Sequence, residues 1–314
     1  MKPALRGLLV LVVAMVATQA GAAAPSRLLT IPYSAAFWSP NDGLLAVGLC
    51  ATDRWSCGTG AVELTTDGGR TYHVVFRTRR PVESVQTVGP GGAIVTSFSR
   101  RSWRTLDGGR TWSPWLRGPF VGLSFATPRL GFGYRFYERG NQSYIELSAT
   151  NDGATWTRLR APCDAAGLLL DRVTAGLGWI LCGGEPGAGN ESKELFRTRD
   201  GGRTWQRLAH TAMTQGLVRG GISSLGYPAG MSFAANGFGL MWESRGTLYV
   251  MRDGGRSWKA RSRFAAFDVD FGLGGAAFAG GTGYVLYSHD GVSYRLIGTR
   301  DYGRTWRIVR SWKR

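Results

Sequence analysis

Three residue types on which many active sites depend are scarce in this chain. Its 314 residues include 4 lysines, 3 histidines and 4 cysteines. So few histidines, together with cysteine spacings unlike those of zinc motifs, argue against a zinc centre. The sequence also lacks a Ser/His/Asp order, a cluster of metal-ligating residues and a phosphate-binding glycine loop. We therefore predict no cofactor and no metal ion, and we assign no catalytic residue.

Long apolar runs are absent beyond the N-terminal segment. The run at residues 8–17 is too short to cross a bilayer, whose apolar core is about 30 Å thick. It follows Lys2 and Arg6 and ends at a cleavage site of small residues, as in a secretory signal peptide. We expect residues 1–22 to be removed and the mature protein, residues 23–314, to be secreted or periplasmic. No membrane span and no lipid anchor are predicted.

Acidic residues are too few to balance the basic ones. The chain has 21 Asp and Glu against 38 Lys and Arg, a formal net charge of +17, and 34 of the basic residues are arginine. A GC-rich coding genome would account for the arginine bias without any function. An acidic partner would account for it equally, such as an anionic glycan, a phosphate-bearing envelope surface or an acidic peptide. Nucleic acid is not expected as a partner of an exported protein.

The four cysteines should pair in an oxidising compartment. Of the three possible connectivities we favour the two local pairs, Cys50–Cys57 and Cys163–Cys182, because each falls within one sequence repeat. A zinc site is the weaker alternative.

Glycine and tryptophan are abundant, with 47 and 12 copies, and many belong to one phrase, Asp-Gly-Gly-Arg-Thr-Trp. We call each of its six copies a box. The box aspartates are Asp67, Asp107, Asp152, Asp200, Asp253 and Asp301, and five boxes end in Trp112, Trp156, Trp205, Trp258 and Trp306. Their spacing of 40 to 53 residues, with strand-like runs between them, is typical of propeller blades.

We therefore predict an all-β, six-bladed β-propeller with four antiparallel strands per blade, folded as one domain. The predicted blades cover approximately residues 28–78, 82–117, 120–161, 166–209, 217–263 and 265–312. Seven blades remain possible, because residues 288–294 look like a degenerate box. Each box should form the turn between the third and fourth strands, with its tryptophan packed beneath. The glycine-rich run 272–283 is interpreted as blade turns.

The box resembles a known repeat. Residues 198–205 read Thr-Arg-Asp-Gly-Gly-Arg-Thr-Trp, which is similar to the Asp-box or BNR repeat, and Thr105 and Thr299 precede two other boxes in the same way. Bacterial sialidases, sortilin-type ectodomains, xyloglucan-cleaving hydrolases and photosystem II assembly factors of the Ycf48 type carry this repeat. The dense pattern here is most similar to the last group. The resemblance implies a propeller whose boxes lie at the blade periphery and serve the scaffold.

The alternative function is a glycoside hydrolase of the exo-sialidase type. The resemblance implies that such an enzyme needs three arginines that grip a carboxylate, a Tyr–Glu nucleophile pair and an acid/base Asp. Its Arg-Ile-Pro element before the first box is missing, since Arg77 follows that box and lacks Ile-Pro. A two-carboxylate mechanism would need acids that face the axis. The candidates are Glu63, Glu146, Glu194, Glu243, Asp268 and Asp270.

We favour a monomeric binding module for a protein or an anionic polysaccharide of the envelope. Its candidate binding residues are the arginines clustered in early loops, which can hold carboxylates or phosphates by bidentate hydrogen bonds. They are Arg77, Arg79, Arg80, Arg100, Arg101 and Arg104, with simple solubility as the alternative explanation. Two unusual loops, 185–192 and 210–229, are further candidates for function.

Overall fold

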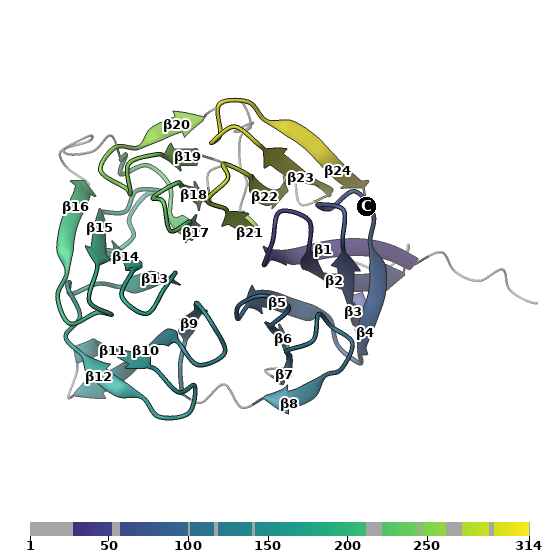
Figure 1. Ribbon diagram of the computed structural model, residues 1–314, viewed down its shortest axis with the longest axis horizontal. Coiled ribbons are helices and arrows are strands. Elements are labelled where there is room, and N and C mark those ends of the chain that lie inside the picture. The colour runs from purple at the N-terminus through teal and green to yellow at the C-terminus, as the bar shows by residue number, and fades with distance from the viewer. Residues whose placement is uncertain are drawn as a thin grey trace, which may run out of the picture.

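The computed structural model describes residues 28–51, 57–99, 101–115, 119–139, 142–211, 222–244, 247–261, 272–288 and 292–313. These residues form strands and turns without a helix, in six antiparallel sheets of four consecutive strands (Figure 1). The predicted six-bladed propeller is thereby confirmed, and no seventh sheet forms in this part of the chain. The segment 1–22, Arg100, residues 212–221, Asp268 and Asp270 lie outside the described residues.

Each blade is one sheet whose strands follow the chain order. Blade 1 contains β1 (Leu28–Phe37), β2 (Gly43–Ala51), β3 (Cys57–Thr65) and β4 (His73–Thr78). Blade 2 contains β5 (Val82–Thr87), β6 (Ala93–Ser97), β7 (Ser102–Thr105) and β8 (Ser113–Trp115). Blade 3 contains β9 (Gly122–Phe125), β10 (Gly131–Arg139), β11 (Gln142–Thr150) and β12 (Thr157–Leu159). Blade 4 contains β13 (Gly167–Arg172), β14 (Gly178–Gly183), β15 (Lys193–Thr198) and β16 (Gln206–Thr211). Blade 5 contains β17 (Pro228–Phe233), β18 (Gly239–Glu243), β19 (Leu248–Met251) and β20 (Lys259–Arg261). Blade 6 contains β21 (Gly272–Ala277), β22 (Gly283–Ser288), β23 (Ser293–Thr299) and β24 (Arg307–Lys313).

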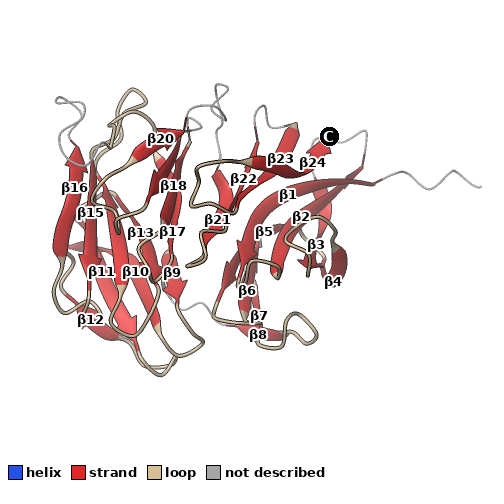
Figure 2. Ribbon diagram, turned by 45° about the horizontal axis from the view of Figure 1, so that its top comes forward, coloured by secondary structure: helices blue, strands red, loops and turns tan. Residues whose placement is uncertain are grey.

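The first strand of every blade lies at the centre of the ring (Figure 1). β1 packs beside both β5 and β21, so the first blade closes the ring against the last. Figure 2 shows the strands running between two faces, with turns and loops at either end.

The hydrophobic core is divided among the six junctions between blades. At the junction of blades 4 and 5, Trp179 and Leu195 pack against Phe233 and Met251. The rings of Trp179 and Phe233 stack with centroids 4.3 Å apart. Each sheet therefore buries its faces against its neighbours, and a single blade has no core of its own.

The interpretation of residues 272–283 as turns was wrong for their first half, which forms the innermost strand β21. The glycines there meet a crowded axis. A Cβ on Gly274 would lie 2.4 Å from the Ala35 carbonyl oxygen, and one on Gly275 would lie 2.9 Å from the Trp242 ring. Glycine is present because neighbouring strands approach so closely, which a turn signal in the sequence does not distinguish.

Both favoured disulfides are formed, Cys50–Cys57 and Cys163–Cys182. The first joins β2 to β3 within blade 1. The second ties the connection between blades 3 and 4 to β14. Covalent links of this kind are consistent with an extracytoplasmic protein.

Candidate functional site

The boxes form compact turns that their aspartates hold together. In blade 4, Asp200 accepts hydrogen bonds from the Thr204 amide at 2.9 Å and its hydroxyl at 2.6 Å, and from the Thr198 hydroxyl at 2.8 Å. Gly201 and Gly202 both have positive φ, 75° and 94°, a conformation that glycine adopts without strain. The aspartates are thus engaged within their own turns, as expected of scaffold.

The box turns share one face of the ring with the turns that join first and second strands. In five blades a box amide donates to the carbonyl of that first turn, for example Gly254 to Gly237 at 3.0 Å and Gly201 to Gly176 at 2.9 Å. We call this side the box face. The remaining loops, including 184–192 and 222–227, belong to the opposite face because strand direction alternates.

The propeller axis holds a cavity of about 330 Å³ lined by the first strands of all six blades. Asp171 is the one charged side chain among the described residues that line it. Burial raises the pKa of Asp171 to about 7, although the Phe233 amide donates a hydrogen bond to its carboxylate. A single carboxylate without an arginine provides neither the acid pair of a glycosidase nor the arginine grip of a sialidase.

The other candidate carboxylates lie away from this cavity. Glu146 pairs with Arg135 at 2.7 Å, and Glu194 pairs with Arg207 at 2.8 Å. Glu63 lies on β3, where burial raises its pKa. None of the four candidate glutamates, which include Glu243, lines the axial cavity.

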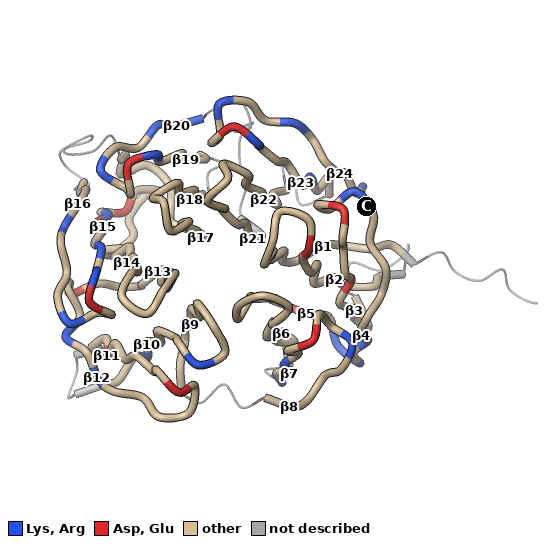
Figure 3. The backbone as a smooth tube through the Cα atoms, viewed as in Figure 1, with Lys and Arg blue, Asp and Glu red and all other residues tan. Residues whose placement is uncertain are grey.

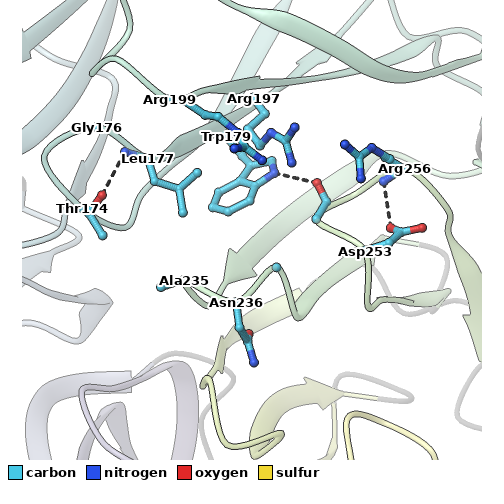
Figure 4. Close-up of a pocket in the computed structure, with 12 residues that line it drawn as sticks. Thr174, Gly176, Leu177, Trp179, Arg197, Arg199, Ala235, Asn236, Asp253 and Arg256 are labelled. Carbon is cyan, nitrogen blue, oxygen red and sulfur yellow. Dashed lines mark hydrogen bonds between the residues drawn. The ribbon is translucent and has the colours of Figure 1, made fainter.

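A larger cavity, of about 570 Å³, opens on the box face between blades 4 and 5. Three arginines line it: Arg197 and Arg199 from blade 4 and Arg256 from the box of blade 5. The close-up shows the Arg197 and Arg256 side chains directed toward each other from the two blades (Figure 4). We call this cavity the arginine pocket.

Packing between the two blades fixes the position of these arginines. The buried Trp179 indole donates to the Gly254 carbonyl at 3.0 Å, which locks blade 4 to the blade 5 box. Arg197 extends across the same junction, since a Cβ on Gly254 would lie 3.1 Å from its Nη1 atom. Its Nη2 atom donates to Gln206 at 2.9 Å. Its side chain is therefore braced from both blades.

The electrostatics of the pocket favour an anion. Arg197 is only 7% exposed, and its Nε atom has no hydrogen-bond partner among the described residues. Burial, and then the charges of Arg199 and Arg256, lower the pKa of Arg197. Burial alone would raise the pKa of Asp253, but hydrogen bonds from Ser257 and the Arg256 amide lower it overall. That carboxylate is held within its own turn, so the lining of the pocket places three guanidinium groups against one carboxylate.

A second, smaller cavity of about 180 Å³ lies between blades 6 and 1. It is lined by Arg70, Arg300 and Arg307. The Tyr284 hydroxyl donates to the Pro40 carbonyl at 2.6 Å and joins the two blades beneath it.

The arginines that the sequence analysis proposed as binding residues do not line the arginine pocket. Arg79, Arg80 and Arg101 are exposed, and a hydrogen bond of 3.2 Å from the Phe98 amide to the Pro81 carbonyl brings their two loops together. Arg77 is exposed on β4, whereas Arg104 is half-buried on β7.

Sequence reasoning missed the arginine pocket, although a signal was present. The residue before the box aspartate is arginine in the last three boxes, at Arg199, Arg252 and Arg300. In the first three it is Thr66, Leu106 and Asn151. This departure from the repeat marks blades 4 to 6, and Figure 3 shows basic positions next to acidic ones along the chain in these blades.

The two unusual loops meet on the opposite face around a buried ion pair. Lys193 and Glu243 are both 0% exposed, with Nζ and Oε1 3.1 Å apart. The Lys193 ammonium also donates to the carbonyls of Ser223 and Gly226, each at 2.9 Å. Burial lowers the pKa of Lys193 and raises that of Glu243. The pair anchors residues 222–227 against loop 184–192 and is closed to ligands.

No group of three or more His, Cys, Asp and Glu side chains is placed to hold a metal ion within the described residues. Over the same residues, no helix has the length and apolarity needed to cross a membrane.

Comparison with known proteins gives the fold alone. No protein-family model matches the chain, and no curated protein matches its sequence. The six-bladed fucose-recognising lectin of Aleuria aurantia is 13% identical with a TM-score of 0.57, over 92% of this chain and 96% of the lectin. YCF48 from Cyanidioschyzon merolae is 16% identical with a TM-score of 0.47, over 90% and 86%. The GH74 xyloglucanase from Xanthomonas campestris is 13% identical with a TM-score of 0.46, over 85% and 45%.

Proposed function

We propose that this protein is an exported, non-catalytic β-propeller that binds a macromolecular partner through the arginine pocket on its box face. The observation that carries the proposal is the convergence of Arg197, Arg199 and Arg256 in one cavity whose single carboxylate is already engaged. Guanidinium groups bind carboxylate, sulfate and phosphate through paired hydrogen bonds. The partner therefore presents an anionic group, as a protein or an anionic polysaccharide does.

Export is part of the proposal. The N-terminal segment has the pattern of a signal peptide, and both cysteine pairs are oxidised. A secreted or periplasmic location would expose the protein to envelope polymers and to secreted proteins.

Thermal stability in inorganic sulfate tests the pocket directly. A ligand that binds the folded protein at ten times its Kd stabilises it by about 1.4 kcal/mol. Sulfate should raise the Tm of the wild type more than chloride of equal ionic strength does. Arg197→Gln combined with Arg256→Gln should remove this excess. Arg110→Gln, at the same box position in blade 2, is the matched control and should keep it. An excess that survives in the double variant would refute the pocket as an anion site.

One observation supports the glycosidase alternative: Asp171 faces the axis with a pKa near that of a catalytic acid, about 7. We expect no turnover of a fluorogenic sialoside or of β-glucan oligomers, because the described axial lining offers no second carboxylate. Turnover that Asp171→Asn abolishes would replace the binding function with a hydrolase.

The arginines in the loops of the first blades are the alternative to the arginine pocket as the binding surface. Replacing Arg77, Arg79 and Arg80 by serine removes three charges, as does replacing Arg197, Arg199 and Arg256. Because the net charge falls by the same amount in both triple variants, a difference in their stabilisation by sulfate shows which group of arginines binds the anion. We expect sulfate stabilisation to be lost in the pocket variant alone, and the reverse result would move the site to the early loops.

A further inference from the structure

Arginines from neighbouring blades meet at two more junctions of the box face beyond the arginine pocket. At the junction of blades 5 and 6 they are Arg252 and Arg304. At the junction of blades 6 and 1 they are Arg70, Arg300 and Arg307. Basic groups therefore occupy three successive junctions, which we call the basic belt.

Arg252 is fixed at its junction as firmly as Arg197 is at the pocket. Its Nε atom donates to the Tyr302 carbonyl of blade 6 at 2.8 Å. Its Nη2 atom is buried and has no hydrogen-bond partner among the described residues. One guanidinium donor is thus buried and unpaired there, as at Arg197.

The belt arises because its boxes carry arginine at the same two positions. Arg252 and Arg300 directly precede their box aspartates, and Arg304 and Arg70 follow theirs by three residues. The belt does not continue around the ring, since the residue before the box aspartate is Thr66, Leu106 or Asn151 in blades 1 to 3. The result is an arc of similar basic sites and not a diffuse positive surface.

The carboxylates of the arc remain charged, but within the described residues none of them forms an ion pair with a belt arginine. The carboxylates of its boxes accept hydrogen bonds from their own turns, for example Asp301 from the Thr305 hydroxyl at 2.7 Å and Asp67 from the Thr71 hydroxyl at 2.6 Å. A ligand with several anionic groups would meet donors at each junction without displacing an existing ion pair.

We infer that the basic belt binds an anionic polysaccharide, with carboxylate or sulfate groups of successive residues engaged at successive junctions. The inference rests on the proposed function and extends it, because it takes the arginine pocket as the first of three sites. A polymer with one anionic group per repeating unit matches a row of basic sites built from one repeated motif. Linked weak sites raise affinity by effective concentration, without any new type of contact.

Single-stranded nucleic acid also has a regular charge, but such ligands use exposed aromatic rings for stacking. At the junction of blades 5 and 6 the half-buried Tyr302 ring already packs against Phe238. Trp179 and Tyr284, the aromatic residues at two of the junctions, are buried to 1% and 4% exposure. Their polar atoms already donate to the Gly254 and Pro40 carbonyls. The polysaccharide is therefore favoured.

The test uses size-defined oligogalacturonates, which carry carboxylates, and heparin oligosaccharides, which carry sulfates. Calorimetry on the mature protein should show affinity that rises at least about tenfold from the shortest oligomer to one that spans the belt. Arg304→Gln and Arg70→Gln should each weaken the long oligomers about three- to tenfold and lower the slope of log K against log salt by about one. Arg110→Gln is the matched control and should change neither. A preference for one series identifies the anionic group.

Three outcomes would overturn the inference: affinity independent of oligomer length, long-oligomer affinity unchanged in both belt variants, or single-stranded DNA of equal charge bound as tightly as the oligosaccharides. The sulfate assay separates this failure from that of the proposed function. If sulfate stabilisation through Arg197 and Arg256 persists while the belt variants have no effect, the pocket stands alone as a single-anion site.

Discussion

At the scale of single residues, buried arginine serves two different purposes in this propeller. Arg172 is 2% exposed, and its Nη1 atom donates to the Gly131 carbonyl at 2.7 Å and to the Thr150 carbonyl at 2.8 Å in blade 3. Its guanidinium also lies 4.7 Å from the centroid of the Phe132 ring. Arg197 is nearly as buried, but its side chain donates to Gln206 and lines the arginine pocket. The first arrangement is structural, and the second suits a ligand.

Arg172→Met should therefore destabilise the fold. The substitution leaves buried carbonyls of blade 3 without donors, and the expected loss is about 3 kcal/mol in the free energy of unfolding. Urea denaturation measures it, with Arg203→Met on the exposed surface as the control. Equal stability of the two variants would show that Arg172 does not hold blades 3 and 4 together.

The box aspartates should make stability depend on acid. The Thr204 hydroxyl and amide, with the Thr198 hydroxyl, lower the pKa of Asp200 from 3.8 to about 2. A folded pKa below the unfolded one gives stability that is present above pH 4 and is lost as the pH falls toward 2. Asp200→Asn should flatten this dependence between pH 4 and 2. In an NMR titration Thr204→Val should raise the pKa of Asp200, and an unchanged value would contradict the assigned hydrogen bonds.

At the scale of elements, the two faces of the ring are organised differently. Repeated turns make the box face, whereas loop 184–192 and segment 222–227 form a non-repeating unit on the other. Glu191 donates its amide to the Ser224 carbonyl at 2.8 Å, and Gly226 donates to the Gly189 carbonyl at 2.9 Å. Lys193 and Glu243 hold this unit from within.

Replacing one member of the Lys193–Glu243 pair should lower the free energy of unfolding more, for each substitution, than replacing both members together. Lys193→Met and Glu243→Gln should each lower the free energy of unfolding by about 3–5 kcal/mol, because each leaves one buried charge unpaired. The double variant should cost clearly less than the sum. Thermal or urea denaturation of the four proteins completes the cycle. Strict additivity would mean that the two side chains do not interact.

At the scale of the whole molecule, the parts of the fold that could be predicted are the local ones. A box turn is held by hydrogen bonds between residues at most four apart in the chain, as between Asp200 and Thr204. Each copy can therefore be recognised from the sequence alone. Six copies at blade spacing then gave the architecture. The run 272–283 was misinterpreted because crowding at the axis involves Ala35 and Trp242, which are distant in the chain.

The sequence marks blades 4 to 6 by the arginine before each box aspartate, but it does not show which arginines meet in one pocket. Arg197 and Arg256 belong to different blades and meet only through the Trp179–Gly254 junction. The early arginines, by contrast, were predicted as a binding site because they are close together in the sequence. Contiguous charge in a sequence identifies an exposed loop more readily than a pocket, since pockets between blades combine residues from separate repeats.

The arginine side-chain resonances offer the most direct measurement of where the protein binds anions. Nε–H signals of ¹⁵N-labelled protein, assigned by single Arg→Gln substitutions, can be followed while inorganic sulfate is added at constant ionic strength. We expect saturable shifts for Arg197 and Arg256 with a common Kd, and only small non-saturating shifts for Arg77, Arg79 and Arg80. Saturable shifts confined to those three early arginines, or an Arg197 signal that does not respond, would contradict binding in the pocket between blades 4 and 5.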